Sequence, residues 1–319
     1  MKSHIFVECL DVVEFSCDVL VLKYAQDFYG ADLAIAVAFD WLPDHFPNNL
    51  PKPGQHILLP TNGKIAAKNI LFVGVVDLYK FDYEKIREFT ATAMKIVYQE
   101  LPDTKTIAMT MHGAGYGLDE REAFSAQVGG LIDSFQDNAT PQFLESITVL
   151  EKNKRRAARI DEILQEFELP IIQTKNSHSL NQTIQSSVID AGLKTNTKQH
   201  IFVAMPYSED MEDIYIFGIQ GPVNTAGYLC ERVDMTTFTG DILSRIKSRS
   251  QATGWQPIVR YSPNTRSNTR SIFLSRVLTS NARSICSALS SSEISGSFVT
   301  NSRKSKPLSH EFSALRCTQ

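Results

Sequence analysis

The feature that most constrains the fold is the alternation, along the first 167 residues, of short apolar runs with longer amphipathic stretches. Short β-branched and apolar runs are typical of strands, and apolar residues repeated every three or four positions are typical of helices. Strands are expected at residues 4–8, 18–22, 56–59, 69–75, 106–111 and 146–150, and helices at residues 30–39, 83–100, 119–135 and 152–167. This alternation predicts an α/β fold with a mixed sheet flanked by helices.

Composition predicts how the chain is divided. The alternating pattern closes near residue 168, residues 169–198 are polar without a clear period and are predicted to be a linker, and a second pattern occupies residues 199–250. Residues 1–250 contain 23 Lys and Arg against 33 Asp and Glu, whereas residues 251–319 contain 9 against 2 and 16 serines. The last segment is therefore expected to be a Ser/Arg-rich tail.

The sequence lacks the features of membrane-spanning, secreted, disulfide-bonded and metal-binding proteins. No run approaches the 18 apolar residues of a membrane span, and the first residues do not have the pattern of a signal peptide. The five cysteines are odd in number and show no CxxC spacing, which argues against a disulfide framework and against a metal site. We expect a cytoplasmic protein without a cofactor.

The most informative segment of the first domain is a glycine-rich loop between an expected strand and an expected helix. The loop consists of Gly113, Ala114, Gly115, Tyr116 and Gly117. Glycine permits a positive φ and a close approach of the backbone, and amides at a helix N-terminus attract phosphate. The loop has two interpretations, a turn that needs glycine for its geometry alone and a site for a diphosphate.

Residues 1–167 resemble macro-like domains, which include the N-terminal domain of leucine aminopeptidases. The resemblance rests on the strand at 18–22, the strand at 70–75 with Gly74, and the glycine loop that enters a helix. Macro domains bind ADP-ribose, and the resemblance implies that residues 113–117 would hold its phosphates. After the first of these strands, such domains usually have Asn residues and a glycine-rich run, whereas Gly30 is the one glycine among residues 23–32 of this chain. A relative without a ligand, as in the aminopeptidases, is the alternative.

The second pattern begins with an expected strand at 199–205, followed by a helix at 211–226, a strand at 229–233 and a helix at 238–248. It predicts an incomplete, flavodoxin-like parallel α/β domain. Ligands of open parallel sheets bind at the carboxyl ends of the strands. The residues expected at those ends are Met205, Pro206, Tyr207, Ser208 and Asp234. Alternatively, Pro206 shapes a turn and Asp234 ends a strand.

Residues 201–250 are similar to the start of nucleoside 2-deoxyribosyltransferase-like domains, which are distant relatives of the Toll/interleukin-receptor-type domains that cleave NAD. The segments AMPYS, CERVD and FTGDI carry this resemblance. It implies that residues 205–208 line a nucleoside pocket and that Asp234 lies at its rim. The family also needs a Glu after the third strand, but past residue 250 the acidic residues are Glu293 and Glu311, in contexts that do not match. A catalytic residue therefore cannot be assigned.

The tail from residue 251 to residue 319 has two interpretations. It is either a disordered Ser/Arg-rich segment or the product of a shifted reading frame, because degenerate codons for residues 250–258 also permit an apolar strand that ends in an acid. In both cases the second domain would end with an unpaired sheet edge, and such edges favour self-association.

Two further features have a structural and a functional interpretation. His112 precedes the glycine loop, where it is either a structural residue or a general base or phosphate partner. A basic run comprises Lys152, Lys154, Arg155, Arg156 and Arg159. Nearby acids and the lack of interleaved aromatic residues favour a solvated helix face over a nucleic-acid surface.

Two functions of different classes follow from these observations. In the first, the macro-like domain recognises a nucleotide or an ADP-ribose-like ligand, and the second domain cleaves or transfers an N-glycosidic bond of a nucleoside or NAD. By analogy of fold, such pairs resemble bacterial effectors of defence or signalling. In the second, the chain is a binding or scaffolding protein without catalysis, because the expected Glu is missing.

Overall fold

The computed structural model of the protein describes residues 2–41, 50–167, 172–173, 186–204, 212–232 and 273–274. Among these residues, one compact unit extends to Lys198 and a second begins at Gln199. No helix in the described ranges is both long enough and apolar enough to cross a membrane.

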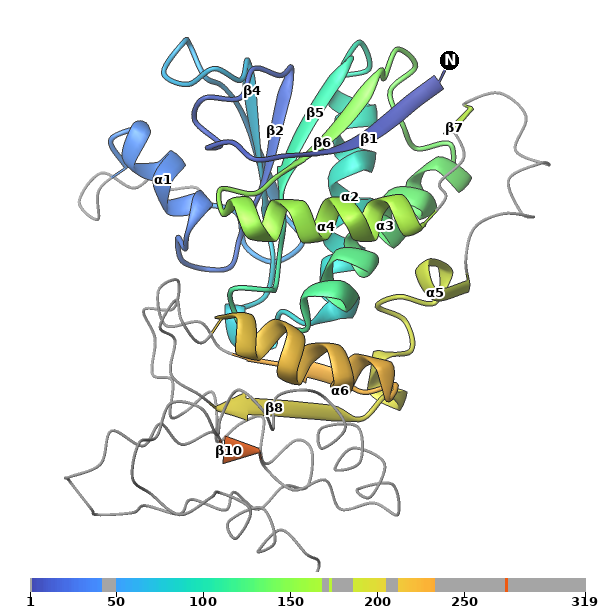
Figure 1. The fold of residues 1–319 in the computed structure, drawn as a ribbon. Coiled ribbons are helices and arrows are strands. Elements are labelled where there is room, and N and C mark those ends of the chain that lie inside the picture. Colours follow the sequence, from blue (N-terminus) through green and yellow to red (C-terminus); the bar gives the residue numbers. More distant parts are fainter. Residues whose placement is uncertain are drawn as a thin grey trace, which may run out of the picture. The chain divides into compact units, whose positions relative to one another are not determined.

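The first unit is built on a seven-stranded sheet with the order β3-β4-β2-β5-β6-β1-β7 (Figure 1). Its strands are β1 (Lys2–Glu8), β2 (Val19–Tyr24), β3 (His56–Pro60), β4 (Asn69–Gly74), β5 (Thr106–Thr110), β6 (Ser146–Leu150) and β7 (Ile172–Gln173). The five inner strands run parallel, and β3 and β7 pair antiparallel at the two ends. The predicted mixed sheet is confirmed.

Helices cover both faces of this sheet. They are α1 (Ala31–Ala38), α2 (Tyr83–Glu100), α3 (Glu120–Gln136), α4 (Lys154–Glu166) and the single turn α5 (Ser186–Ile189), with short 3-10 turns η2 (Leu78–Lys80) and η4 (Thr195–Thr197). Figure 1 shows α4 crossing in front of the sheet and α2 behind it. Glycine at position 130 lets α3 approach α2 closely, because a Cβ there would collide with the carbonyl oxygen of Arg87.

The core explains why β2 reads as a continuous apolar run. All four residues from Val19 to Leu22 are fully buried. Leu20 and Leu22 lie in one hydrophobic cluster with Ile35 of α1, and the residues between them face the opposite side of the sheet because side chains alternate along a strand. A strand buried on both faces needs apolar residues at every position.

Side-chain caps set where the long helices begin. Asp82, Asp119 and Asn153 each accept a hydrogen bond at 3.0 Å from an amide in the first turn of α2, α3 and α4. Such a cap satisfies one of the amides that the helix itself cannot pair. The helix predicted at 83–100 is confirmed, and the other two begin one and two residues later than predicted because Asp119 and Asn153 are caps.

Residues 186–198 pack against the helices of the first unit. Arg87 of α2, which is almost fully buried, donates to the carbonyl oxygens of Val188, Ile189 and Ala191 at 3.3, 2.8 and 2.7 Å. Its other nitrogens bind both carboxylate oxygens of Asp133 at 2.6 and 2.7 Å. The domain boundary at residue 168 stays a prediction, and this part of the predicted linker makes tertiary contacts.

In the second unit, a three-stranded sheet has the order β10-β8-β9. Its elements are β8 (His200–Ala204), the π-helical segment η6 (Ile214–Gln220), α6 (Gly221–Thr225), β9 (Leu229–Glu231) and β10 (Phe273–Leu274). β8 and β9 are parallel, and β10 pairs antiparallel with β8. The core is an apolar cluster of Ile201, Val203, Tyr215, Ile219, Val223, Tyr228 and Cys230. The expected helix at 238–248, and the tail apart from β10, lie outside the described residues.

Candidate functional site

The sheet order of the first unit identifies a place for a ligand. β2 and β5 are parallel neighbours, and the chain leaves them in opposite directions, from β2 through α1 to β4 on one side and from β5 through α3 to β6 on the other. In open α/β sheets, ligands bind in the crevice at the carboxyl ends of such a pair of strands. The segments that border this crevice are the one after β2 and the glycine loop after β5.

The glycine loop is shaped by both backbone and packing. Gly113 and Gly117 have φ values of +94° and +93°, which residues with a side chain rarely adopt. A Cβ at Gly113 would lie 2.9 Å from the side chains of Ile86 and Leu118. The carbonyl of Gly113 accepts from the amides of Tyr116 and Leu118 at 3.0 and 3.2 Å. Geometry therefore requires glycine at position 113, whatever the loop binds.

Some backbone amides of the loop have no hydrogen-bond partner in the described part of the chain. Within the described ranges, the amides of Gly113, Ala114 and Gly117 have no acceptor at hydrogen-bonding distance. The end of α3 itself is partly satisfied, because Asp119 caps it and the amide of Asp119 donates to the hydroxyl of Tyr83 at 2.8 Å. Among the described residues, the loop amides are thus candidate donors to an anion.

On the β2 side of the crevice, two charged residues form a buried ion pair. Lys23, at the end of β2, contacts Asp32 in the first turn of α1 at 2.5 Å, and both side chains are at most 3% exposed. Burial is the largest single influence and would lower the pKa of Lys23, but the charge of Asp32, its hydrogen bond and the nearby Tyr116 and Tyr29 together outweigh burial, so the pKa is raised. The second carboxylate oxygen of Asp32, Oδ1, is buried without a hydrogen-bond partner among the described residues.

Tyr116 bridges the crevice from the glycine loop to the start of α1. Its ring lies with its centroid 5.2 Å from Nζ of Lys23 and edge-on to Tyr29, at 6.2 Å between centroids. A Cβ built on Gly30, which has a φ of +52°, would lie 3.3 Å from the Tyr116 hydroxyl. The sequence analysis placed Tyr116 in the loop, but no signal in the sequence indicated this contact with Gly30.

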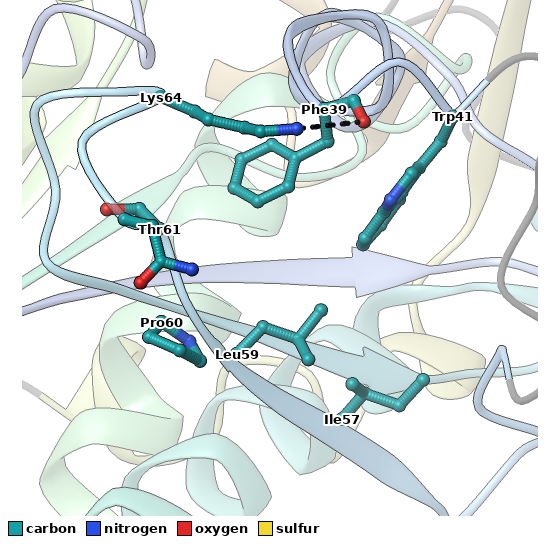
Figure 2. A pocket seen from close by; sticks show the side chains of 8 residues that line it. Phe39, Trp41, Ile57, Leu59, Pro60, Thr61 and Lys64 are labelled. Carbon is teal, nitrogen blue, oxygen red and sulfur yellow. Dashed lines mark hydrogen bonds between the residues drawn. The ribbon is translucent and has the colours of Figure 1, made fainter.

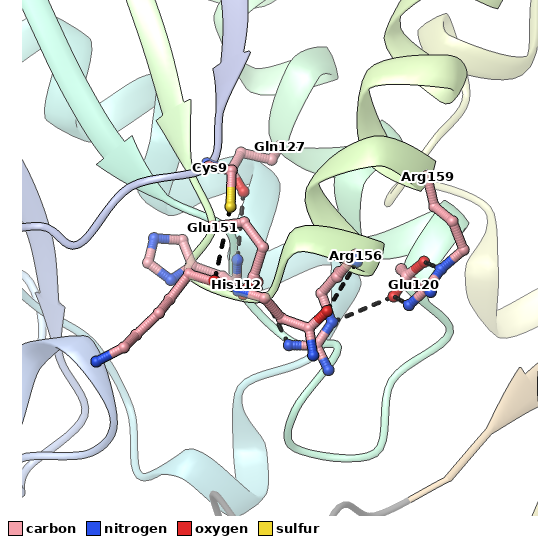
Figure 3. Close-up of polar contacts among 9 residues, drawn as sticks. Cys9, His112, Glu120, Gln127, Glu151, Arg156 and Arg159 are labelled. Carbon is pink, nitrogen blue, oxygen red and sulfur yellow. Dashed lines mark hydrogen bonds and ion pairs between the residues drawn. The ribbon is translucent and has the colours of Figure 1, made fainter. Parts of the chain in front are cut away.

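His112 is a buried neutral residue of the core. Its ring lies edge-on to Phe89, at 4.7 Å between centroids, and its amide donates to Oε1 of Gln127 at 3.4 Å (Figure 3). Burial, with a smaller contribution from the charge of Lys23, holds the pKa of His112 well below its ordinary value. Nε2 has no partner within the described part of the chain. This environment supports the structural interpretation.

The basic run of α4 is largely paired with acids. Arg159 and Arg156 contact the carboxylate of Glu120 at 2.7 and 3.2 Å, and Arg156 also contacts Glu151 at 3.3 Å (Figure 3). Lys152 contacts Asp11 at 2.9 Å. A surface for nucleic acid needs cations that are available to phosphates. Arg156 and Arg159 are mostly buried in these ion pairs, so they are not presented to phosphates.

A shallow pocket of about 440 Å³ lies elsewhere on the first unit (Figure 2). Phe39, Trp41, Ile57 and Leu59 line it, and Lys64 at its rim donates to the carbonyl of Phe39 at 3.5 Å. Because β3 runs antiparallel to β4, the pocket lies toward the amino ends of the parallel strands, opposite the crevice. Sequence reasoning missed this pocket, since its residues share no motif.

The other predicted site residues cannot be compared with the structure. Residues 205–208 and Asp234 lie outside the described ranges, although β8 and β9, which precede them, pair in parallel. In the described part of the chain, no group of three or more His, Cys, Asp or Glu could hold a metal ion.

The fold and the site define an open α/β domain that carries a glycine loop at its switch point, the place between β2 and β5 where the chain leaves two neighbouring strands in opposite directions. No family model matches the sequence, and no curated protein matches it. Among solved structures, the chain is similar to an Oceanobacillus iheyensis macrodomain with ADP, at 16% identity and a TM-score of 0.40, covering 50% of this chain and 89% of that one. It is also similar to a Trypanosoma brucei macrodomain in complex with ADP, at 14% identity and a TM-score of 0.41, covering 51% and 69%.

Proposed function

We propose that the first unit binds the diphosphate of a nucleotide-type ligand on the glycine loop. The observation that carries the proposal is the set of three loop amides, of Gly113, Ala114 and Gly117, which have no acceptor among the described residues and lie at the switch point. Convergent backbone amides at the start of a helix bind phosphate oxygens without any cationic side chain.

The charges around the loop are compatible with an anion. Asp119, Glu120 and Glu122 begin α3 and would repel a phosphate if they were unpaired. Glu120 is neutralised by two arginines, and Glu122 contacts Nζ of Lys198 at 2.6 Å. Asp119 caps the helix and interacts electrostatically with Arg121. The positive end of the α3 dipole then favours negative charge beside the loop.

The class of ligand follows from the resemblance of residues 1–167 to macro-like domains. That resemblance implies a nucleotide or an ADP-ribose-like molecule, and a diphosphate is the group that the loop amides suit best. The alternative is a loop whose glycines serve geometry alone, for which Gly113 gives direct support.

Calorimetry with ADP tests the proposal. We expect the full chain to bind ADP, and we expect Gly115→Val to weaken binding at least about tenfold, because the added side chain occupies the space beside the loop amides. Lys85→Ala is the control, since Lys85 lies in α2 in an exposed ion pair with Glu88 and is not part of the loop. If the parent protein does not bind ADP at millimolar concentration, the loop has only a structural role.

For the second unit, we propose that relatives which retain the catalytic Glu cleave or transfer the N-glycosidic bond of a nucleoside or NAD. The support is the sequence resemblance of residues 201–250. For this chain the alternative is favoured, a binding or scaffolding protein without catalysis, because past residue 250 its acids are Glu293 and Glu311 alone. A role in bacterial defence or signalling rests on the same resemblance.

A further inference from the structure

A diphosphate can carry one organic group or two. In a nucleoside diphosphate the terminal phosphate is free, whereas in a diester such as ADP-ribose each phosphate carries an organic arm. A diphosphate on the loop after β5 has neighbours on two sides, because β5 lies between β2 and β6 in the sheet. A ligand with two arms would direct one toward the β2 side and the other toward the β6 and β1 side.

The β2 side of the crevice is occupied by side chains of the protein itself. Tyr116 extends from the loop to the start of α1, where a Cβ on Gly30 would already lie 3.3 Å from its hydroxyl. The ring of Tyr29 lies against it, and Lys23 is beneath it, held by Asp32. No organic group can pass between Tyr116 and Gly30 while the ring keeps this position.

The β6 and β1 side is more accessible. β1 and β6 are parallel to β5, so their carboxyl ends reach the same edge of the sheet. There Glu8, Cys9 and Lys152 are exposed and Asp11 is half-buried. An organic arm directed to this side meets solvent-exposed residues rather than a packed ring.

We propose that Tyr116 makes the crevice selective for diphosphates with a single organic arm, such as nucleoside diphosphates, and excludes those with a second arm on the terminal phosphate. This inference rests on the proposed binding of a diphosphate to the glycine loop. Tyr116 is then a specificity-determining residue, which acts by filling the space that a second arm would need.

Removal of the ring would leave a polar surface for the second arm. Lys23 donates one hydrogen bond, to Asp32, and the ammonium has three hydrogens. Oδ1 of Asp32 is buried without a partner in the described ranges. The hydroxyl groups of a sugar both donate and accept hydrogen bonds. Once the ring is absent, they could accept from the ammonium of Lys23 and donate to Oδ1 of Asp32.

Calorimetry of the full chain with ADP and with ADP-ribose tests the inference, because the two molecules share one arm and differ in the second. We expect the parent protein to bind ADP-ribose at least about tenfold more weakly than ADP. In Tyr116→Ala the two affinities should become similar within about threefold. Tyr116→Phe, which keeps the ring, should retain the preference for ADP. Circular dichroism and thermal unfolding establish that both variants are folded.

The outcomes separate the two proposals. If neither ligand binds, the proposed function is wrong, and this inference with it. If the parent binds ADP-ribose as tightly as ADP, binding on the loop stands and the selectivity is wrong. The same conclusion follows if folded Tyr116→Ala keeps the parent's preference. If Tyr116→Ala does not fold, Tyr116→Leu, which removes the aromatic ring but keeps an apolar side chain, should reduce the preference, and an unchanged ratio in that variant contradicts the inference.

Discussion

At the scale of single residues, buried polar groups of the first unit lie around the crevice. Lys23, Asp32 and His112 are each at most 2% exposed, and Lys23 interacts electrostatically with both of the others. Burying such groups without full hydrogen bonding costs about 1–3 kcal/mol for each unpaired group. The atoms that bear this cost are Oδ1 of Asp32 and Nε2 of His112, which have no partner among the described residues.

His112 predicts a pH dependence of stability. Its pKa in the folded protein is well below that of an exposed histidine, so below about pH 6.5 the unfolded chain binds a proton that the folded chain does not. The contribution of His112 to the free energy of unfolding must therefore fall as the pH falls. We expect urea unfolding to show that, between pH 6.5 and pH 5.5, the free energy of unfolding falls by about 1 kcal/mol less in His112→Phe than in the parent protein.

Val97→Ala on α2 gives the control for this measurement, because it removes buried apolar atoms and no titratable group. It should lower the unfolding free energy but leave its pH dependence equal to that of the parent. A His112→Phe variant whose pH dependence equals the parent's would mean that the buried ring does not titrate as inferred. Phenylalanine is the suitable replacement because the ring of His112 packs edge-on against Phe89.

At the scale of elements, the first unit depends on a contact that joins distant segments. Arg87 of α2 holds the turn α5 through three carbonyl oxygens and holds α3 through Asp133. Hydrogen bonds from a charged group contribute about 1.5–3 kcal/mol each when they are buried. The segment that follows the predicted boundary at residue 168 is therefore expected to stabilise the sheet domain.

A comparison of two fragments tests this expectation. A fragment of residues 1–168 contains the whole alternating pattern and should unfold cooperatively. A fragment of residues 1–198 should be more stable in urea by about 2–4 kcal/mol, because Arg87 then has its carbonyl acceptors. Arg87→Leu should reduce the stability of the longer fragment by more than that of the shorter one.

Lys85 supplies the matched control on the same helix. It forms an exposed ion pair with Glu88, and such pairs contribute little to stability. Lys85→Ala should therefore change both fragments equally, by less than about 1 kcal/mol. Equal stability of the two parent fragments would show that residues 169–198 behave as a linker after all.

At the scale of the whole molecule, two α/β units follow one another, and each has its own apolar cluster. The second is a single parallel β-α-β arrangement with one added antiparallel strand. Glycosidic chemistry needs a placed carboxylate, and the sequence offers no matching Glu after residue 250.

We therefore expect the purified full chain to show no turnover of NAD or of deoxynucleosides. Chromatography of the reaction mixture, with release of the free base as the signal, is the measurement. Asp234→Ala provides the comparison, because the sequence resemblance puts Asp234 at the rim of the nucleoside pocket. Release of base by the parent that disappears in this variant would assign catalysis to the second unit.

The sequence predicted the elements of the first unit well because those elements depend on local patterns. The apolar run of β2 and the stripe of α2 are visible in the chain itself, whereas Asp119 and Asn153 were predicted inside their helices and instead cap them. Their physical causes, burial of one face and satisfaction of helix-end amides, act over a few residues. The glycine loop was found for the same reason.

Which residues meet at the carboxyl ends of β2 and β5 was decided by the tertiary structure. Tyr116 and Gly30 are separated by more than eighty residues, and they meet only because β2 and β5 are neighbours in the sheet. The pairing of Lys23 with Asp32, and the hold of Arg87 on residues 188–191, likewise depend on which elements pack together. Local patterns specify strands and helices, whereas strand order and side-chain packing determine which distant residues share a site, because only the folded core brings them within contact distance.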